Sequence, residues 1–561
     1  MAGRASPVRP TDRWGTDCMN VHEAVARETA EPWGPPPFPE PPARTPETSG
    51  FATKLPLAWT TGVALRAGKV TIGGSPWEVT LLPEAVRPFA RKVYAANRSG
   101  VTAATPEERD AAVYLLDRGI ADPLPAPAGK AGPVDDVEIV VPVYGDSAPL
   151  ERCLASLASE GLPVTVVDDA SPKADAARIR RIAKAHGARL VVRRTNGGPG
   201  GARNAGFRAT TAPFVAFLDS DVVASPNWVS RLRPLFEDPL VGAVGPRVRP
   251  DVRGASSIEL YEEARSELDM GPDPSRVVYG VPVGWLPTAS AIVRRAAVTD
   301  PPFEPGLRLG EDVDLFWRMH EAGWTVRYVT DVVNHHGVRT SLKDFCGRRA
   351  GYGSSAADLE LRHPGRLIPA RPSLSGLAVV AALSNRRGWV RALALPVAGY
   401  ELARQRRILG KRIPFSVAVE MTGRSLFSDA FWMGHLLRRD WWPVGWTVLA
   451  LAPFSRLARG AAAAMAWEPV RDHLLRPARL GPFRSLALRL LDDASYGSGV
   501  ILGAIRRRVP NAVTPRVRFP SWPRRGAPAG QASLQAGPQV ATRRALVVAD
   551  EPASPAVPRD G

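Results

Sequence analysis

The chain has 561 residues, of which 45% are hydrophobic, so it can bury the cores of more than one domain and is not a wholly disordered protein. Its formal net charge of +18 favours an anionic partner: a nucleic acid, an anionic membrane surface or a phosphorylated substrate. The cysteines Cys18, Cys153 and Cys346 are far apart in the sequence, which disfavours a disulfide framework and favours a reducing compartment.

The N-terminal part combines proline-rich sequence with a small module. Prolines crowd residues 32–46, and residues 1–50 are predicted to be a disordered arm. No charged and then apolar leader opens the chain, so a cytoplasmic location is expected. Residues 51–121 predict a hairpin followed by helices, with Thr105 beginning a capping box. This order is compatible with a winged helix. A packing or docking domain is the alternative, and DNA binding is disfavoured because basic residues are not concentrated on the second helix.

After a proline-rich linker expected at residues 122–134, strands alternate with helices. Apolar strands are predicted at residues 137–143, 163–167, 189–192 and 214–218. Helix starts are marked by Ser147, by Ser171-Pro172 and by the glycine-rich stretch at 197–206. The alternation predicts an α/β domain with a mostly parallel sheet and helices on both faces. Ligands of such sheets bind beyond the carboxyl ends of the strands.

Acidic residues follow two of these strands. Asp168 and Asp169 end the second strand, and Asp219, Ser220 and Asp221 end the fourth. An Asp-x-Asp sequence at a strand end supplies hard oxygen ligands for Mg²⁺ or Mn²⁺, which would hold a diphosphate. A solvated turn is the alternative, since Asp and Ser also favour turns. The two acidic strand ends together favour a metal site.

The stretch GGPGGARNAG, Gly197–Gly206, is neither a Walker A loop nor a dinucleotide-binding fingerprint. No Lys-Ser or Lys-Thr follows its glycines, and Arg203 stands where the fingerprint needs its last glycine. The stretch predicts the start of a helix at which backbone amides, Arg203 and Asn204 serve a diphosphate. Close packing of the helix on the sheet is the alternative explanation of the glycines.

Glu311, Asp312 and Asp314 lie at the start of a later predicted helix. The helix dipole favours carboxylates there in any protein. A carboxylate that points into a cleft opposite a bound sugar nucleotide could instead be the general base for an incoming hydroxyl. A strand-like segment then leads to His335 and His336. One of this pair is a candidate third metal ligand, and the sequence leaves open which of the two it is; we assign His336 to the metal set.

The segments VVPVYGD, VVDDAS, GGPGGARNAG, FLDSD and LGEDVDLFWR, in this order, resemble the family 2 glycosyltransferases of GT-A fold. The resemblance covers roughly residues 135–345 of a domain expected at 135–365. It implies an inverting, metal-dependent transfer of a hexose from a nucleotide-diphosphate sugar to a hydroxyl.

The same resemblance implies roles for the residues at matching positions. Asp221, and less directly Asp219, would hold Mg²⁺ or Mn²⁺. Asp312 would be the base in a single displacement at the anomeric carbon, and Glu311 would assist or orient it. The residues assigned to donor binding are Pro142, Val143, Asp168, Asp169, Arg203, Asn204, Asp219 and Ser220.

The front module and the segment RRAGYGSSAADLELRHPG at 348–365 are similar to the glycosyltransferases of mycofactocin systems. This similarity implies a peptide-derived redox cofactor or its precursor as acceptor and UDP-glucose as donor. The front module also resembles small winged-helix domains that bind precursor peptides. A cell-envelope glycan or glycolipid transferase is the alternative. A non-enzymatic basic adaptor for a peptide or nucleic acid is more remote, because both acidic motifs occur in the expected order.

Processive polysaccharide synthases of the wider family carry Gln-x-x-Arg-Trp after the histidine region, where this chain reads FCGRRAGYG. The departure disfavours a membrane-spanning polymer synthase. Arg348, Arg349 and Tyr352 in this region are candidates for lining the donor or acceptor site, with an exposed basic helix face as the alternative.

Residues 366–508 are expected to be helical, and residues 509–561 to be a disordered tail. The apolar runs at 374–383, 389–400 and 441–454 are shorter than the roughly 20 residues of a spanning helix. Neighbouring basic clusters and tryptophans favour helices that lie on the anionic inner face of the cell membrane. Buried helices of an extra subdomain are the alternative.

Overall fold

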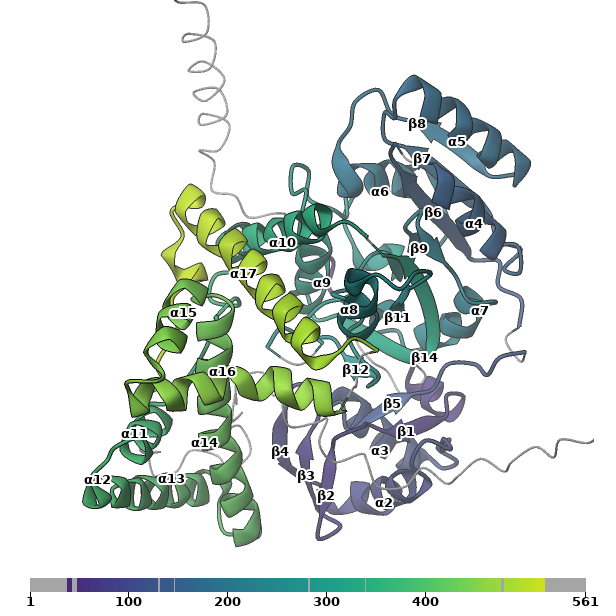
Figure 1. The fold of residues 1–561 in the computed structure, drawn as a ribbon. Coiled ribbons are helices and arrows are strands. Elements are labelled where there is room, and N and C mark those ends of the chain that lie inside the picture. Colours follow the sequence, from purple (N-terminus) through teal and green to yellow (C-terminus); the bar gives the residue numbers. More distant parts are fainter. Residues whose placement is uncertain are drawn as a thin grey trace, which may run out of the picture. The chain divides into compact units, whose positions relative to one another are not determined.

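The computed structural model describes residues 38–42, 48–129, 132–145, 147–280, 283–338, 340–475 and 479–519. Along the chain these residues form a small N-terminal module, an α/β domain and a C-terminal series of helices (Figure 1). Most of the arm predicted at 1–50, and the tail from residue 520 onward, lie outside the described residues.

The N-terminal module contains a three-stranded antiparallel sheet and two helices. The sheet is formed by β2 (Ala64–Arg66), β3 (Val70–Gly73) and β4 (Glu78–Leu81). Helices α2 (Arg87–Ala96) and α3 (Pro106–Asp117) follow it, as the sequence predicts. Its proposed resemblance to a peptide-binding winged helix stays a prediction.

The module continues past the boundary predicted at residue 121. Strand β5 (Ala121–Pro123) pairs antiparallel with β1 (Leu57–Trp59), and Asp122 lies opposite Ala58 in this ladder. The predicted linker therefore starts two residues too early, because the proline-rich composition hides the long-range backbone pairing that orders these residues.

The central sheet has the strand order β10-β14-β11-β13-β9-β6-β7-β8, and β12 pairs with β14. Its strands are β6 (Val137–Val143), β7 (Val164–Asp168), β8 (Arg189–Val192), β9 (Phe214–Leu218), β10 (Val222–Val223), β11 (Val241–Asp251), β12 (Ser275–Arg276), β13 (Ser290–Arg294) and β14 (Thr325–Gly337). The four strands predicted from the sequence, β6 to β9, are parallel to their neighbours in that group. Beyond β9 the sheet is mixed, since β13 pairs antiparallel with both β9 and β11.

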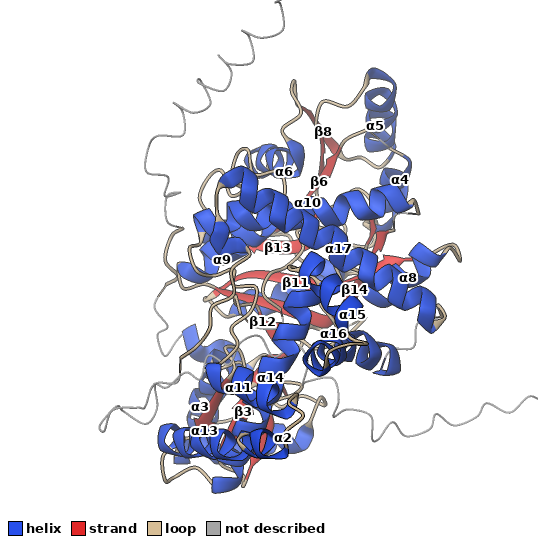
Figure 2. Cartoon of the chain, turned by 60° about the vertical axis from the view of Figure 1, so that its left-hand side comes forward, coloured by secondary structure: helices blue, strands red, loops and turns tan. Residues whose placement is uncertain are grey.

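Helices lie on both faces of this sheet (Figure 2). Val141 of β6 belongs to the core shared with α4 (Ala148–Ser156) and α5 (Lys173–Ala185). The preceding residue, Val140, belongs to the core shared with α6 (Gly198–Ala209). Alternate residues of a strand point to opposite faces, so the apolar run Ile139–Val143 of this strand is buried from both sides.

The other helices named below lie within the sheet domain or follow it, and those that follow it form the helical C-terminal region expected from the sequence. They are α8 (Ser257–Arg265) and α9 (Glu311–Glu321) within the domain, and then α10 (Leu342–Arg362), α11 (Leu374–Leu383), α12 (Gly388–Ala392), α13 (Ala394–Leu409), α14 (Phe415–Arg438), α15 (Trp442–Leu451), α16 (Arg456–Leu475) and α17 (Pro482–Arg507). Among the described residues, every helix is too short or too polar to cross a membrane.

Both ends predicted to be disordered are in part ordered. Phe38 is buried in the sheet domain, and the Arg318 guanidinium lies 4.1 Å from the centre of its ring. At the other end, Val509 and Ala512 are buried against α10 and α17, and the N–H of Arg518 donates to the carbonyl of Pro372 at 2.8 Å. The predicted tail therefore begins too early, because a few apolar side chains anchor residues whose local composition resembles a linker.

Candidate active site

The Asp-x-Asp turn, Asp219–Asp221 with Ser220 at its centre, lies between β9 and β10, beyond the carboxyl end of β9. Strand β10 pairs antiparallel with β14, and this pairing brings the distant His336 to the turn. The His336 Nε2 atom is 3.2 Å from Oδ2 of Asp221. His335 is exposed to solvent. The structure thus brings together the ligand set predicted from the sequence, with His336 as the histidine.

The ligand atoms of Asp219, Asp221 and His336 all lie within 4.8 Å of one another. Two carboxylates and an imidazole suit a divalent metal such as Mn²⁺ or Mg²⁺, so the residues present fit the expected ion. Burial acts to lower the pKa of His336, but the Asp221 carboxylate outweighs burial and the pKa is raised. A metal would need the neutral imidazole, so its affinity should increase with pH.

Arg203 of α6 connects this cluster to the start of α9. Its Nη2 donates to Oδ1 of Asp219 at 2.6 Å, and its Nη1 donates to Oε1 of Glu311 at 3.0 Å. The guanidinium is buried, and Phe303 packs against it. In this arrangement Arg203 orients two carboxylates. Direct contact between Arg203 and a diphosphate stays a prediction.

The glycine-rich stretch has a packing role that the sequence analysis left as an alternative. A Cβ atom at Gly206 would lie 2.2 Å from Cγ1 of Val140, so only glycine lets α6 approach β6 so closely. Asn204 holds the loop before α9: its Nδ2 donates to the Phe303 carbonyl at 2.8 Å, and its Oδ1 accepts the Phe303 N–H at 2.9 Å. Asn204 therefore holds the loop that precedes α9 in place. Its contact with the donor stays a prediction.

Asp312, in the first turn of α9, has the chemistry of a general base. Its pKa is raised to about 8, mainly by burial and also by the neighbouring Glu311 carboxylate, against the opposing effect of Arg203. Burial also raises the pKa of Glu311 itself. A carboxylate that titrates near neutral pH can take a proton from a hydroxyl far more readily than an ordinary, solvated one.

Asp314, two residues further along α9, is fully buried and serves another purpose. Its Oδ2 accepts from Arg318 at 2.8 Å, and its Oδ1 accepts from Arg362 of α10 at 2.5 Å and lies 3.1 Å from His363 Nε2. Burial acts to raise its pKa, but these partners hold it well below the usual range. Asp314 is therefore a permanently ionised anchor between α9 and α10.

The predicted nucleoside-binding residues gather where β6 and β7 end. Val143, the last residue of β6, lies opposite Asp168, and its neighbour Pro142 is buried inside the sheet. The carbonyl of Val143 accepts the N–H of Asp169 at 2.9 Å, and the Asp169 carboxylate accepts the N–H of Gly197 at 3.1 Å. These bonds join the strand ends to the start of α6.

Helix α10 supplies two further side chains next to the metal cluster. Arg348 donates to the hydroxyl of Tyr352 at 3.2 Å, and both line a small cavity of about 40 Å³ that His336 also lines. Arg349 behaves differently, because it is buried and pairs with Glu262 at 2.6 Å. Arg349 also lines this cavity. The alternative of an exposed basic helix face therefore fails for Arg349, whereas Arg348 is exposed and borders the candidate site.

Two family profiles match the chain: Glycosyl transferase family 2 over residues 138–279, and Glycosyl transferase family group 2 over residues 214–467. The chain is also 33% identical over 484 residues to the Pre-mycofactocin glycosyltransferase of Mycobacterium tuberculosis, a match that covers 83% of this chain and 99% of the relative. The chain belongs to glycosyl transferase family 2. The GT-A type α/β fold and the glycosyltransferase class expected from the sequence are thereby confirmed.

Weaker similarities extend to other members of this class. Glycosyltransferase AglE of Haloferax volcanii is 26% identical over 211 residues, which is 36% of this chain and 67% of that protein. Among solved structures, the mannosyltransferase PcManGT from Pyrobaculum calidifontis, in complex with GDP-Man and Mn²⁺, matches with a TM-score of 0.36 and 17% identity. That match covers 67% of this chain and 87% of the mannosyltransferase.

Proposed function

We propose that this family 2 glycosyltransferase moves glucose from UDP-glucose to a hydroxyl of pre-mycofactocin, the precursor of a peptide-derived redox cofactor, with inversion at the anomeric carbon. The acceptor is suggested by the name of the Mycobacterium tuberculosis relative, which this chain matches over 99% of its length. The observation that carries the chemistry is that Arg203 bonds both Asp219 of the acidic cluster and Glu311, the residue before Asp312, whose pKa is about 8.

The metal cluster would prepare the donor. Asp219, Asp221 and His336 would hold Mg²⁺ or Mn²⁺, which when bound compensates the negative charge of the departing diphosphate. Arg203 fixes the orientation of Asp219 through its 2.6 Å bond. Arg348 adds a positive charge at the same edge and is proposed to contact the diphosphate.

The transfer itself is a single displacement. The acceptor oxygen forms a bond to the anomeric carbon while the bond from that carbon to the diphosphate oxygen breaks, and UDP leaves with the electron pair. The Asp312 carboxylate takes the proton of the attacking hydroxyl. Attack from the face opposite the leaving group inverts the configuration. The nucleoside would lie at the strand ends formed by Val143, Asp168 and Asp169.

A transfer assay tests the proposal. The full chain is incubated with pre-mycofactocin and each of UDP-glucose, UDP-galactose, UDP-N-acetylglucosamine and GDP-mannose, with Mn²⁺ or with EDTA, and products are identified by mass spectrometry and NMR. We expect transfer from UDP-glucose, loss of transfer in EDTA and a β-linked product from the α-linked donor. An α-linked product would refute inversion, and transfer to a lipid-linked envelope acceptor in place of pre-mycofactocin would refute the acceptor.

We also propose that the C-terminal helices rest on an anionic membrane surface. Around α12, the side chains of Trp389 and Leu395 are 64% and 76% exposed, and Arg387 and Arg391 are exposed beside them. Phe454, between α15 and α16, is 81% exposed. Exposed apolar residues next to arginines suit the boundary between anionic headgroups and lipid chains.

Vesicle flotation tests this association. The protein should float with vesicles of phosphatidylglycerol and phosphatidylcholine but not with pure phosphatidylcholine, and Trp389→Asp should weaken binding. Tyr94→Asp, at a side chain 47% exposed on the N-terminal module, is the control and should leave binding unchanged. Equal flotation of all three proteins would contradict the assignment of this surface.

A further inference from the structure

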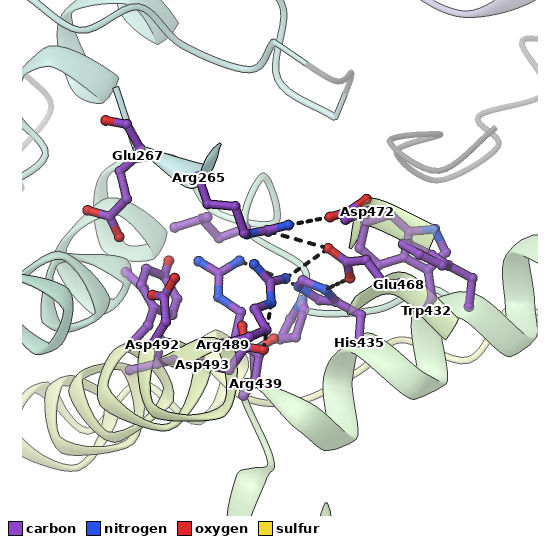
Figure 3. Close-up of a pocket in the computed structure, with 18 of the residues that line it drawn as sticks. Arg265, Glu267, Trp432, His435, Arg439, Glu468, Asp472, Arg489, Asp492 and Asp493 are labelled. Carbon is purple, nitrogen blue, oxygen red and sulfur yellow. Dashed lines mark hydrogen bonds and ion pairs between the residues drawn. The ribbon is translucent and has the colours of Figure 1, made fainter. Parts of the chain in front are cut away.

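A cavity of about 470 Å³ lies between the segment that follows α8 and the helices α14, α16 and α17 (Figure 3). We call it the helical cavity. In Figure 3, Glu267 and Trp432 lie on opposite sides of it. Its volume falls in the range of roughly 300–1,000 Å³ typical of small-molecule sites. No residue proposed above for donor, metal or proton chemistry lines it.

Part of the cavity wall is a network of buried ion pairs. Arg438 of α14 donates to Glu468 of α16 at 2.7 Å and also pairs with Asp493 of α17. Arg489 donates to the same Glu468 at 2.8 Å. Burying charges costs several kcal/mol per ion unless partners compensate them, so this network gives the wall one well-defined arrangement.

Other polar groups of the cavity wall do not take part in this network of ion pairs. The Asp440 carboxylate is buried at the cavity, and the adjacent Arg439 guanidinium compensates part of its charge. One oxygen of Glu267 pairs with Arg349 at 2.6 Å, but its buried Oε2 has no hydrogen-bond partner in the described chain. The same holds for the buried Nε1 of Trp432. Buried polar atoms are nearly always satisfied, so the Glu267 and Trp432 atoms point to a ligand, and Asp440 adds a second carboxylate to the same cavity.

Two carboxylates and an indole N–H select for a definite chemistry. The carboxylates accept hydrogen bonds from hydroxyl or N–H groups, and the indole N–H donates to an oxygen. The Trp432 ring and the Tyr496 ring, on which Arg439 is stacked at 3.5 Å, offer apolar surface beside them. An excess of carboxylates disfavours an anionic ligand such as the diphosphate of the donor.

We propose that the helical cavity binds the acceptor of the transfer reaction: a non-anionic, hydroxyl-bearing organic molecule with an apolar ring face, held by Glu267, Asp440 and Trp432. The inference rests on the proposed function, because it assigns the second substrate of the same reaction to a place outside the donor site.

The helical cavity and the small cavity beside the candidate active site share two lining residues. Glu267 and Ser266 line both the helical cavity and the small cavity that reaches His336 and Arg348. Helix α17, which carries part of the wall, is clamped against α10: a Cβ atom at Gly499 would lie 1.9 Å from the carbonyl oxygen of Ala350. An acceptor in the helical cavity could therefore extend a hydroxyl past Glu267 toward the metal cluster and Asp312.

Kinetics with two substrates test the assignment. The variants are Trp432→Ala and the nearly isosteric Asp440→Asn, which guards against loss of folding in the first. For each we would measure KM for pre-mycofactocin, KM for UDP-glucose and the release of UDP by hydrolysis without acceptor. Trp432→Ala removes an indole N–H donor and Asp440→Asn removes a buried negative charge from the proposed site, so we expect the acceptor KM to rise about tenfold or more. The donor KM and UDP hydrolysis should stay unchanged.

The matched control is Trp467→Ala, because this tryptophan of α16 is 45% exposed and does not line the cavity. It should leave both KM values unchanged. Binding of pre-mycofactocin, measured by saturation-transfer NMR without donor, separates the two proposals. Wild-type transfer with unaltered acceptor KM in both cavity variants would overturn the cavity assignment alone. Binding that the variants weaken, without any transfer, would overturn the proposed function alone. No binding would overturn the cavity assignment.

Discussion

The Asp-x-Asp site and the helical cavity both gather carboxylates, but their charges are balanced differently. At the site, Arg203 bonds Asp219 and Glu311, and the pKa of Asp312 still rises to about 8 because of burial and the adjacent carboxylate. In the cavity wall, burial acts to raise the pKa of Glu468, but Arg438 and its other cationic partners lower it well below the usual value. An acidic cluster short of cations can take up a metal or a proton, whereas a compensated cluster sets the shape of a wall.

The largest effect is expected for Asp312→Asn, which tests whether this carboxylate is the base of the reaction. Loss of the base should slow transfer about 10²- to 10⁴-fold and leave the affinity for UDP-glucose unchanged, because the donor does not depend on that proton transfer. Steady-state transfer and calorimetric donor binding measure the two effects. Asp300→Asn, at a solvent-exposed ion pair with Arg208, should retain wild-type rates. Wild-type transfer by Asp312→Asn would exclude the base role.

The metal site can be tested with adjacent histidines. His336→Ala should weaken Mn²⁺ dependence, with the metal concentration for half-maximal transfer rising at least about tenfold, as for lost metal-site partners in general. His335→Ala is the matched control, because this neighbour is exposed and is absent from the cluster. Metal titrations of the two variants that coincide would contradict the ligand set.

The rigid wall of the helical cavity predicts a stability effect without a charge change. Gly499→Ala forces a methyl group against the Ala350 carbonyl, where only 1.9 Å is available, and should destabilise the protein by about 1–3 kcal/mol. Gly423→Ala, in the middle of α14 with no atom within 4 Å of the added carbon, should be neutral or stabilising. Thermal melts followed by circular dichroism compare them. Similar melting temperatures would argue against the clamp between α10 and α17.

The smallest expected effect is a shift in the pH dependence of transfer, caused by the Glu311 carboxylate beside Asp312. The base must be ionised to act, so kcat/KM should rise with pH through an apparent pKa near 8. Glu311→Gln removes a like charge beside Asp312 and should move this rise to lower pH. The pH profile from 6 to 10 gives the shift. If the profile of Glu311→Gln stayed in place or moved to higher pH, the group that titrates in the assay would not be Asp312.

The parts of the fold that could be predicted from the sequence are those with local causes. The strands β6 to β9 are short runs rich in apolar residues, and the acidic turn follows the end of β9. The start of α9 carries three carboxylates, which the helix dipole favours there. The boundaries predicted for the N-terminal module, at residue 121, and for the tail, at residue 509, are wrong. The pairing of β5 with β1 and the burial of Val509 depend on distant segments of the chain.

The sequence by itself determined the family, the order of the acidic motifs and the identity of the candidate base, because those features sit at strand ends and helix starts that neighbouring residues specify. Tertiary structure decided which histidine reaches the Asp-x-Asp turn, through the pairing of β10 with β14. It also decided that Arg203 bonds carboxylates and that Arg349 is buried. The helical cavity also depends on tertiary structure alone. Glu267, Trp432 and Asp440 line one cavity only because segments far apart in the chain pack together.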